Sequence, residues 1–399
     1  MSHSNLPSSP SPRYAAAGDF MRVFCAFMIG WYHIWQQSWL TPTLRLGGLT
    51  LDFYPWVRAG YMFVDLMLLL SGFLCYLPYA NDRAPAPRDF YLRRRAARIL
   101  PGYWLALAVM LAFAVTAPDF DRPALLARDL GAHLAFIHNL FRFSYSQTRL
   151  NAVLWTLAVE VQFYLLLPAL APLFNRRPLL CWGAMTGIAL SFRLLWTAPM
   201  PDTTMFVNRL PNMLDLYADG MLAAHLYAKL ARRKDHRALI AALGTLLCAL
   251  GAWGVLHTVK VQATAYGDYS ALRLGQLTRR WPLGVCGAAF LLGGSLGFGP
   301  LRRLLSNRVL RFLGGASYSF YIWHQWLAVR LKQWRIPPYR AAADPNQAWE
   351  MPWQLHYTLL CFAAALLLAV LIHQFVEKPA ARRLAGIKPG RITKILRRR

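Results

Sequence analysis

The chain has 399 residues, of which 57% are hydrophobic and only 15% are charged, and its formal net charge is +27. This apolar share is too high and this charged share too low for an ordinary water-soluble domain, so the composition indicates a polytopic membrane protein. The positive charge alone would suit a nucleic-acid-binding protein, but its distribution along the chain argues against that class.

Apolar windows of about 20 residues, the length that crosses a bilayer as a helix, predict an all-α transmembrane bundle. The ten windows lie near 20–40, 61–79, 101–117, 152–174, 179–198, 211–230, 238–257, 281–298, 309–331 and 354–376. A weaker apolar segment near 124–143 carries Arg128, Asp129, His133 and His138 and is predicted to be interfacial or re-entrant. We therefore expect a disordered tail over 1–19, a membrane domain over 20–376 and a basic tail over 377–399.

Lysine and arginine are concentrated on one side of the predicted spans. The segments 80–99, 175–178, 231–237, 299–308 and 377–399 hold 24 of them in 64 residues, whereas the alternate segments hold 14 in 111. This is the positive-inside bias, and it predicts that both termini are cytoplasmic. Anionic membrane lipid then accounts for most of the basicity, and no nucleic-acid partner is predicted. The six cysteines all fall within spans and lack metal-ligand spacing, so no metal site is predicted.

The first span carries two ionisable residues, Arg22 and His33. An ionisable side chain inside a span is costly unless it faces the bundle interior, where it is usually functional. Imidazole can accept a proton near neutral pH, so His33 is the leading candidate for a general base. The alternative is a structural histidine bonded to a neighbouring helix.

The second span contains Asp65 and the small pair Ser71-Gly72. Asp65 needs a polar partner inside the bundle. The small pair allows another helix, or a thin ligand arm, to approach the backbone closely.

Arginines cluster at the cytoplasmic mouth of the third span. Arg94, Arg95 and Arg98 are separated by helical spacings that place them on one face. Guanidinium groups arranged in this way can bind phosphate bidentately. The alternative is that they are juxtamembrane basic residues that serve topology alone.

Polar residues recur in two later spans. Glu160 and Gln162 lie near the outer end of the fourth span and are expected to face a polar interior. Ser317, Tyr321 and His324 follow one another at helical spacing in the ninth span. They can line the same cavity, although a tyrosine and histidine at a membrane edge also serve as interfacial anchors.

Taken in chain order, these strings resemble the acyltransferase-3 family of integral membrane acyltransferases, almost from end to end. The matching pieces are Asp19-x-x-Arg22 and His33; Val64-Asp65 through Ser71-Gly72-Phe73-Leu74; Arg95-x-x-Arg98-Ile-Leu-Pro101; Leu154-Trp155 through Glu160-x-Gln162-Phe163-Tyr164; Leu313-Gly314 through Ser317-Tyr318, Tyr321 and His324; and Glu377-Lys-Pro379. Each piece alone is weak, but the ordered set on a chain with ten predicted spans is specific.

The resemblance implies transfer of an acyl group, usually acetyl from acetyl-CoA, to a hydroxyl of a sugar or glycan. It implies that His33 is catalytic and that Arg95 and Arg98 contact the acyl donor. Two departures are visible: Met67-Leu68 replaces the usual aromatic pair, and Val161 replaces a second acid after Glu160. No hydrolase-like domain follows the last span, so transfer is expected to finish within the bundle.

The residue pattern and the family resemblance together predict one mechanism. Acetyl-CoA, a co-substrate rather than a bound cofactor, approaches from the cytoplasmic arginines. His33 lies about 13 residues, or roughly 20 Å, beyond the inner end of its span. His33 takes the proton of the acceptor hydroxyl, and Glu160 or Asp65 orients its ring. Direct transfer and a transient acyl-enzyme both fit.

The expected mechanism limits the class of acceptor and the location of the protein. A glycan, a lipid-linked sugar or a glycosylated small molecule all suit the mechanism, and a bacterial cytoplasmic (inner) membrane is the expected location. One rival is a transporter or flippase, in which the buried ionisable residues relay protons or bind a solute. A second rival is a non-enzymatic membrane sensor, which predicts that His33 is dispensable.

Overall fold

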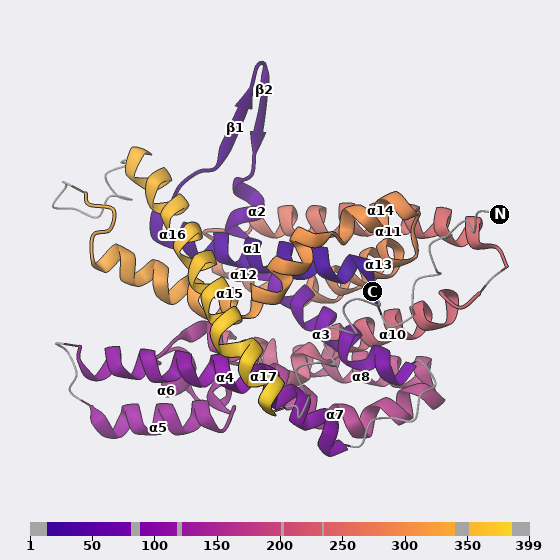
Figure 1. The fold of residues 1–399 in the computed structure, drawn as a ribbon, viewed down its shortest axis with the longest axis horizontal. Coiled ribbons are helices and arrows are strands. Elements are labelled where there is room, and N and C mark those ends of the chain that lie inside the picture. Colours follow the sequence, from indigo (N-terminus) through magenta and orange to yellow (C-terminus); the bar gives the residue numbers. More distant parts are fainter. Residues whose placement is uncertain are drawn as a thin grey trace, which may run out of the picture.

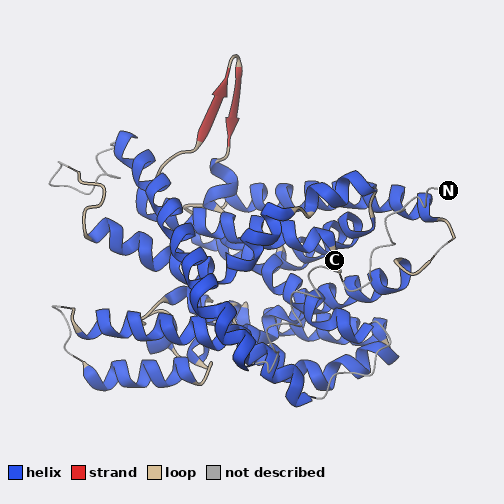
Figure 2. Ribbon diagram, in the orientation of Figure 1, coloured by secondary structure: helices blue, strands red, loops and turns tan. Residues whose placement is uncertain are grey.

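The computed structural model describes residues 14–80, 88–117, 122–200, 203–233, 235–339 and 351–384. Helices make up nearly all of this part of the chain, and its one sheet is a two-stranded hairpin (Figure 2). The prediction of an all-α bundle is confirmed at this level.

Each predicted window falls on a long helix (Figure 1). These helices are α1 (Ala16–Ser38), α3 (Phe63–Ala80), α4 (Arg88–Val115), α7 (Trp155–Arg176), α8 (Pro178–Phe192), α10 (Leu214–Leu230), α11 (Arg237–Ala263), α13 (Arg280–Leu296), α15 (Arg308–Gln333) and α16 (Met351–Ile372). Within the described ranges, six helical segments are long and apolar enough to cross a membrane: Gly60–Ala80, Arg88–Val115, Ala152–Arg176, Pro178–Thr197, Arg237–Ala263 and Met351–Leu384. The chain is therefore a multi-pass membrane protein.

The other four long helices are less typical as spans. α10 and α13 have 17 residues each, and α1 and α15 carry the candidate histidines. α1 contacts α3, α13, α15 and α16, so neighbouring helices surround much of its surface. Polar side chains inside a membrane are tolerated where neighbouring helices cover them.

Shorter elements connect the long helices. They are α2 (Tyr54–Arg58), α5 (Pro123–Leu134), α6 (Arg142–Tyr145), α9 (Thr204–Val207), α12 (Tyr269–Thr278), α14 (Gly299–Leu305) and α17 (Lys378–Leu384). α1 begins at Ala16, so the last residues of the predicted disordered tail are helical, and residues 1–13 lie outside the described ranges. α17 occupies the start of the predicted basic tail, whose remainder also lies outside them.

The hairpin between α1 and α2 was not predicted. Its strands, β1 (Thr43–Leu46) and β2 (Leu49–Asp52), pair antiparallel around Gly47, whose φ of 59° favours glycine. Figure 1 shows the hairpin projecting away from the helices.

The segment near 124–143 folds back along α4. Tyr103 donates a hydrogen bond to the carbonyl of His133 at 3.0 Å and its ring stacks on Phe136 with centroids 4.7 Å apart. Tyr103 lies about 18 Å before the end of α4, since twelve residues separate it from Val115. α5 has only 12 residues, too few to span, so the structure favours a re-entrant segment.

Close helix packing explains part of the small-residue pattern. A Cβ on Gly72 would lie 2.7 Å from the carbonyl oxygen of Tyr217, and one on Gly220 would lie 2.1 Å from that of Leu69. Glycines at these two positions let the backbones of α3 and α10 approach each other, as small residues commonly do between membrane helices.

Candidate active site

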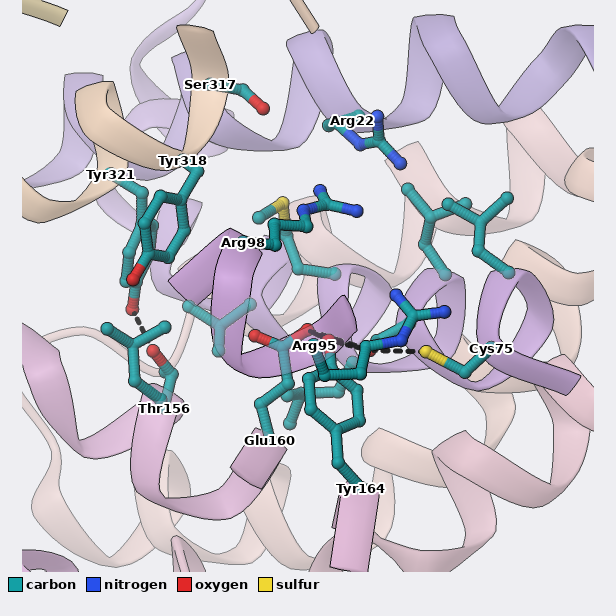
Figure 3. A pocket seen from close by; sticks show the side chains of 17 residues that line it. Arg22, Cys75, Arg95, Arg98, Thr156, Glu160, Tyr164, Ser317, Tyr318 and Tyr321 are labelled. Atoms are coloured by element: carbon teal, nitrogen blue, oxygen red, sulfur yellow. Dashed lines mark hydrogen bonds between the residues drawn. The ribbon is translucent and has the colours of Figure 1, made fainter. Parts of the chain in front are cut away.

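A narrow cavity between α1, α3, α4, α7 and α15 gathers most of the candidate residues (Figure 3). The candidates that line it are Arg22, Ser71, Arg95, Arg98, Glu160, Tyr164, Ser317 and Tyr321. The cavity volume is about 80 Å³. Pockets that hold small molecules usually measure about 300–1,000 Å³, so binding an extended ligand here requires side chains to move.

Three arginines converge on this cavity, Arg22 from α1 and Arg95 and Arg98 from α4 (Figure 3). The Arg95 guanidinium lies 5.3 Å from the ring centroids of both Tyr91 and Tyr164, which fixes its position. With Glu160 as the lone carboxylate among the lining residues, the cavity is strongly cationic and suits an anionic ligand.

Arg94 lies apart from these three arginines. Its side chain is exposed and its guanidinium lies 5.5 Å from the ring centroid of Phe90, outside the set of cavity-lining residues. The sequence placed Arg94, Arg95 and Arg98 on one face, but only Arg95 and Arg98 reach the cavity.

Glu160 is held by neutral hydroxyl donors. Ser71 Oγ donates to Glu160 Oε1 at 2.8 Å, and Tyr164 also donates to this carboxylate. The Ser71 and Tyr164 hydroxyls are themselves 3.2 Å apart. Glu160 therefore belongs to the arginine-lined cavity and is engaged there rather than with His33.

His33 is paired with a second histidine. His33 Nδ1 lies 2.8 Å from His324 Nε2, and His324 Nδ1 lies 3.2 Å from the carbonyl oxygen of Phe320. A carbonyl only accepts, so His324 carries its proton on Nδ1 and accepts through Nε2. His33 then donates from Nδ1, which leaves its Nε2 lone pair available as a base. His324 is 1% exposed and His33 is half-buried, so His33 is the more accessible of the two.

The histidine pair and the cavity adjoin each other. Arg22 and His33 are eleven residues apart on α1, which puts them on the same face at about 16 Å. Tyr321 lines the cavity and its ring lies 5.6 Å from that of His324. Its hydroxyl accepts a hydrogen bond from Thr156 Oγ1 at 2.9 Å and donates to the carbonyl of Val153 at 3.1 Å. His33 is not itself a cavity-lining residue, so Tyr321 connects the two parts of the site.

The remaining candidates make structural contacts. Asp65 pairs with Arg280, whose Nε lies 3.1 Å from Asp65 Oδ2, and both side chains are buried. Gln162 donates to the Phe136 carbonyl and to Asn139, each at 3.0 Å, which ties α7 to the turn that follows α5. Gly72 packs against α10, as described above. Asp65 therefore has a partner other than His33.

Some lining residues were missed by the sequence reasoning. Cys75, Thr156 and Tyr318 also line the cavity. Cys75 follows Ser71 by one helical turn, so helical spacing could have placed it on the same face. Among the described residues, no group of three or more His, Cys, Asp or Glu side chains is arranged to hold a metal ion.

In a helical membrane protein, a cationic cavity beside a histidine pair is an arrangement that suits an enzyme with an anionic co-substrate. The chain belongs to the acyltransferase-3 family: the family model described as an acyltransferase domain matches residues 16–374. This membership favours the enzyme over the transporter and sensor alternatives.

Three of the proteins that resemble this chain are named as O-acetyltransferases or as an exopolysaccharide production protein. The peptidoglycan O-acetyltransferase OatA of Listeria monocytogenes is 24% identical over 353 residues, covering 82% of this chain and 52% of that protein. The O-acetyltransferase OatA of Staphylococcus aureus is 22% identical over 360 residues, covering 82% of this chain and 54% of that protein. The exopolysaccharide production protein ExoZ of Rhizobium meliloti is 29% identical over 268 residues, covering 65% of this chain and 74% of that protein. The chain thus spans about half the length of the OatA proteins. No solved structure matches it significantly.

Proposed function

We propose that the protein transfers an acetyl group from cytoplasmic acetyl-CoA to a hydroxyl of a glycan or lipid-linked sugar at the outer side of the membrane. The observation that carries the proposal is a cavity lined by Arg22 of α1 and by Arg95 and Arg98 of α4, beside the face of α1 that also carries His33. The relatives support a carbohydrate acceptor, since two are named for peptidoglycan and exopolysaccharide.

The donor enters at the arginines. Its phosphates bind Arg95 and Arg98 at the mouth of α4, with Arg22 deeper in the cavity. The thioester arm then extends along α1 toward His33, over the distance of about 16 Å that separates Arg22 from His33. The acceptor approaches His33 from the opposite end of the bundle.

The histidine pair performs the proton transfer. His33 Nε2 takes the proton of the acceptor hydroxyl as its oxygen attacks the thioester carbonyl carbon. The C–S bond breaks, and the proton held by His33 passes to the departing CoA thiolate. His324 accepts the Nδ1–H of His33 throughout, which fixes the ring orientation and the tautomer.

For the bundle we propose ten spans with both termini in the cytoplasm of a bacterial cell, in its inner membrane. The excess of 24 basic residues in 64 over 14 in 111 supports this orientation.

In a variant without native cysteines, Ser270→Cys is expected to react with an impermeant maleimide in intact cells, and Asp235→Cys only after lysis. Both positions are exposed. Labelling of Asp235→Cys in intact cells would reverse the orientation and the donor route.

The paired arginines give a direct test of donor binding. Arg95→Ala with Arg98→Ala is expected to weaken CoA binding by tenfold or more, since a hydrogen bond to a charged group contributes about 1.5–3 kcal/mol. Lysine at both positions should restore part of the affinity, because a point charge lacks the bidentate fork. Isothermal titration of the purified protein with CoA measures both effects.

Arg94→Ala is the matched control, because Arg94 lies on the same helix turn but is exposed outside the cavity. It should bind CoA as the wild type does. Wild-type affinity in the double alanine variant would show that Arg95 and Arg98 serve topology and would remove the proposed donor site. Transfer of labelled acetyl from acetyl-CoA to isolated surface glycan tests the overall reaction.

A further inference from the structure

A second hollow lies on another side of α1. It is an apolar groove of about 820 Å³ bordered by α1, α3, α11, α13 and the junction of α14 with α15, and it shares no lining residue with the arginine cavity. We call it the α1–α11 groove. Its floor is buried, with Met21, Phe63 and Leu66 no more than 3% exposed. Its rim is open, with Leu304 69% and Val309 64% exposed.

The floor of the α1–α11 groove is a row of aromatic rings. Phe20 stacks on Phe24 with centroids 5.4 Å apart, and Phe24 meets Phe63 edge-on at 5.4 Å. Phe290 lies 5.8 Å from Phe20 across the groove. This surface is apolar along its length and borders the membrane-spanning helices α3 and α11, so a hydrocarbon chain of the bilayer can cover it.

Only one end of the groove is polar. Asn307 and Arg308 are the polar side chains among its lining residues, and none of the described residues that line it is acidic. Arg308 is exposed and supplies positive charge at that end. A ligand that matches this pattern has a long apolar body and an anionic head.

We propose that the α1–α11 groove binds an anionic phospholipid of the surrounding membrane, with a hydrocarbon chain along Phe20, Phe24 and Phe63 and the phosphate at Arg308. The volume lies within the range of about 300–1,000 Å³ that is usual for specific small-molecule sites. Basic residues at the cytoplasmic ends of membrane helices commonly select anionic headgroups.

The bound lipid is distinct from the sugar acceptor. Ser306, next to Asn307, donates to Asp19 Oδ2 at 2.7 Å, so the polar end of the groove lies at the beginning of α1. His33 is fourteen residues further along this helix, or about 21 Å away. A headgroup at Arg308 cannot reach the base. The lipid instead supports the face of α1 that neighbours the one carrying Arg22 and His33.

The test uses the full chain, purified in detergent and placed in nanodiscs of phosphatidylcholine alone or of phosphatidylcholine mixed with phosphatidylglycerol. Wild-type protein is expected to retain phosphatidylglycerol in native mass spectrometry and to melt at a higher temperature in the mixed nanodiscs. Arg308→Gln should reduce phosphatidylglycerol affinity about fivefold, the equivalent of about 1 kcal/mol for one arginine near the membrane surface. Ala252→Trp places an indole in the groove and should obstruct the hydrocarbon chain, so retention is expected to be lost.

Two controls change the same residue types outside the groove. Arg303→Gln removes an exposed arginine of α14, and Ala249→Trp adds an indole at an exposed position of α11; neither residue lines the groove. Both should retain phosphatidylglycerol as the wild type does. Equal retention of phosphatidylcholine and phosphatidylglycerol by the wild type would overturn the proposal, as would a preference that survives Arg308→Gln. Arg308 is exposed, so its substitution leaves the fold intact and the test decisive.

Discussion

His33→Asn is expected to reduce acetyl transfer per folded molecule by about 10²- to 10⁴-fold, the usual contribution of a general base. Asparagine cannot accept a proton near neutral pH. Its amide can still donate to His324 Nε2, which His33 Nδ1 contacts at 2.8 Å, so the link between α1 and α15 is preserved. The fold and the binding of CoA at the arginine cavity should therefore remain close to those of the wild type.

The measurement is transfer from labelled acetyl-CoA, normalised to folded protein, together with the melting temperature and the CoA affinity of the same sample. A structural His33 predicts a lower melting temperature, with activity falling only in step. Wild-type turnover in a stably folded His33→Asn protein would remove His33 from the mechanism and pass the role of base to His324 or Glu160.

The helices and much of the cavity could be predicted from the sequence. Hydropathy windows located the long helices, since a span needs a continuous apolar run. Helical spacing grouped Arg95 with Arg98 and Ser317 with Tyr321, and both pairs line one cavity. Spacing along one helix reports which residues share a face.

Spacing does not report which helices face each other. His33 and His324 are 291 residues apart, and Asp65 and Arg280 are 215 apart. Both pairings depend on how the bundle packs. The sequence therefore left Glu160 and Asp65 as candidates to orient His33, whereas the structure places His324 there and gives each carboxylate other partners.

The β-hairpin has a recognisable pattern in the sequence. Leu44, Leu46, Leu49 and Leu51 alternate with polar residues around Gly47-Gly48, which is a hairpin pattern. Windows of about 20 residues average over such a short alternation, so a search for spans does not detect it.

The last prediction concerns His324, a positioning residue. His324→Phe keeps an aromatic ring in this buried site but removes the acceptor for His33 Nδ1–H. His33 then no longer holds a fixed tautomer, and imidazolium loses a stabilising partner. Loss of the orienting acid in serine hydrolase triads costs about 10⁴ in kcat. A neutral imidazole stabilises a cation less than a carboxylate does, so we expect kcat to fall by about 10²- to 10³-fold, with the KM for acetyl-CoA unchanged.

His324→Gln separates positioning from packing, because its amide oxygen can accept the same hydrogen bond from His33. We expect it to recover a large part of the kcat lost in His324→Phe. Steady-state kinetics and melting temperatures of the two variants make the comparison. If His324 serves packing alone, activity should follow the melting temperature in both variants and glutamine should give no selective recovery. Wild-type kcat in His324→Phe would show that the contact at 2.8 Å has no part in orienting His33.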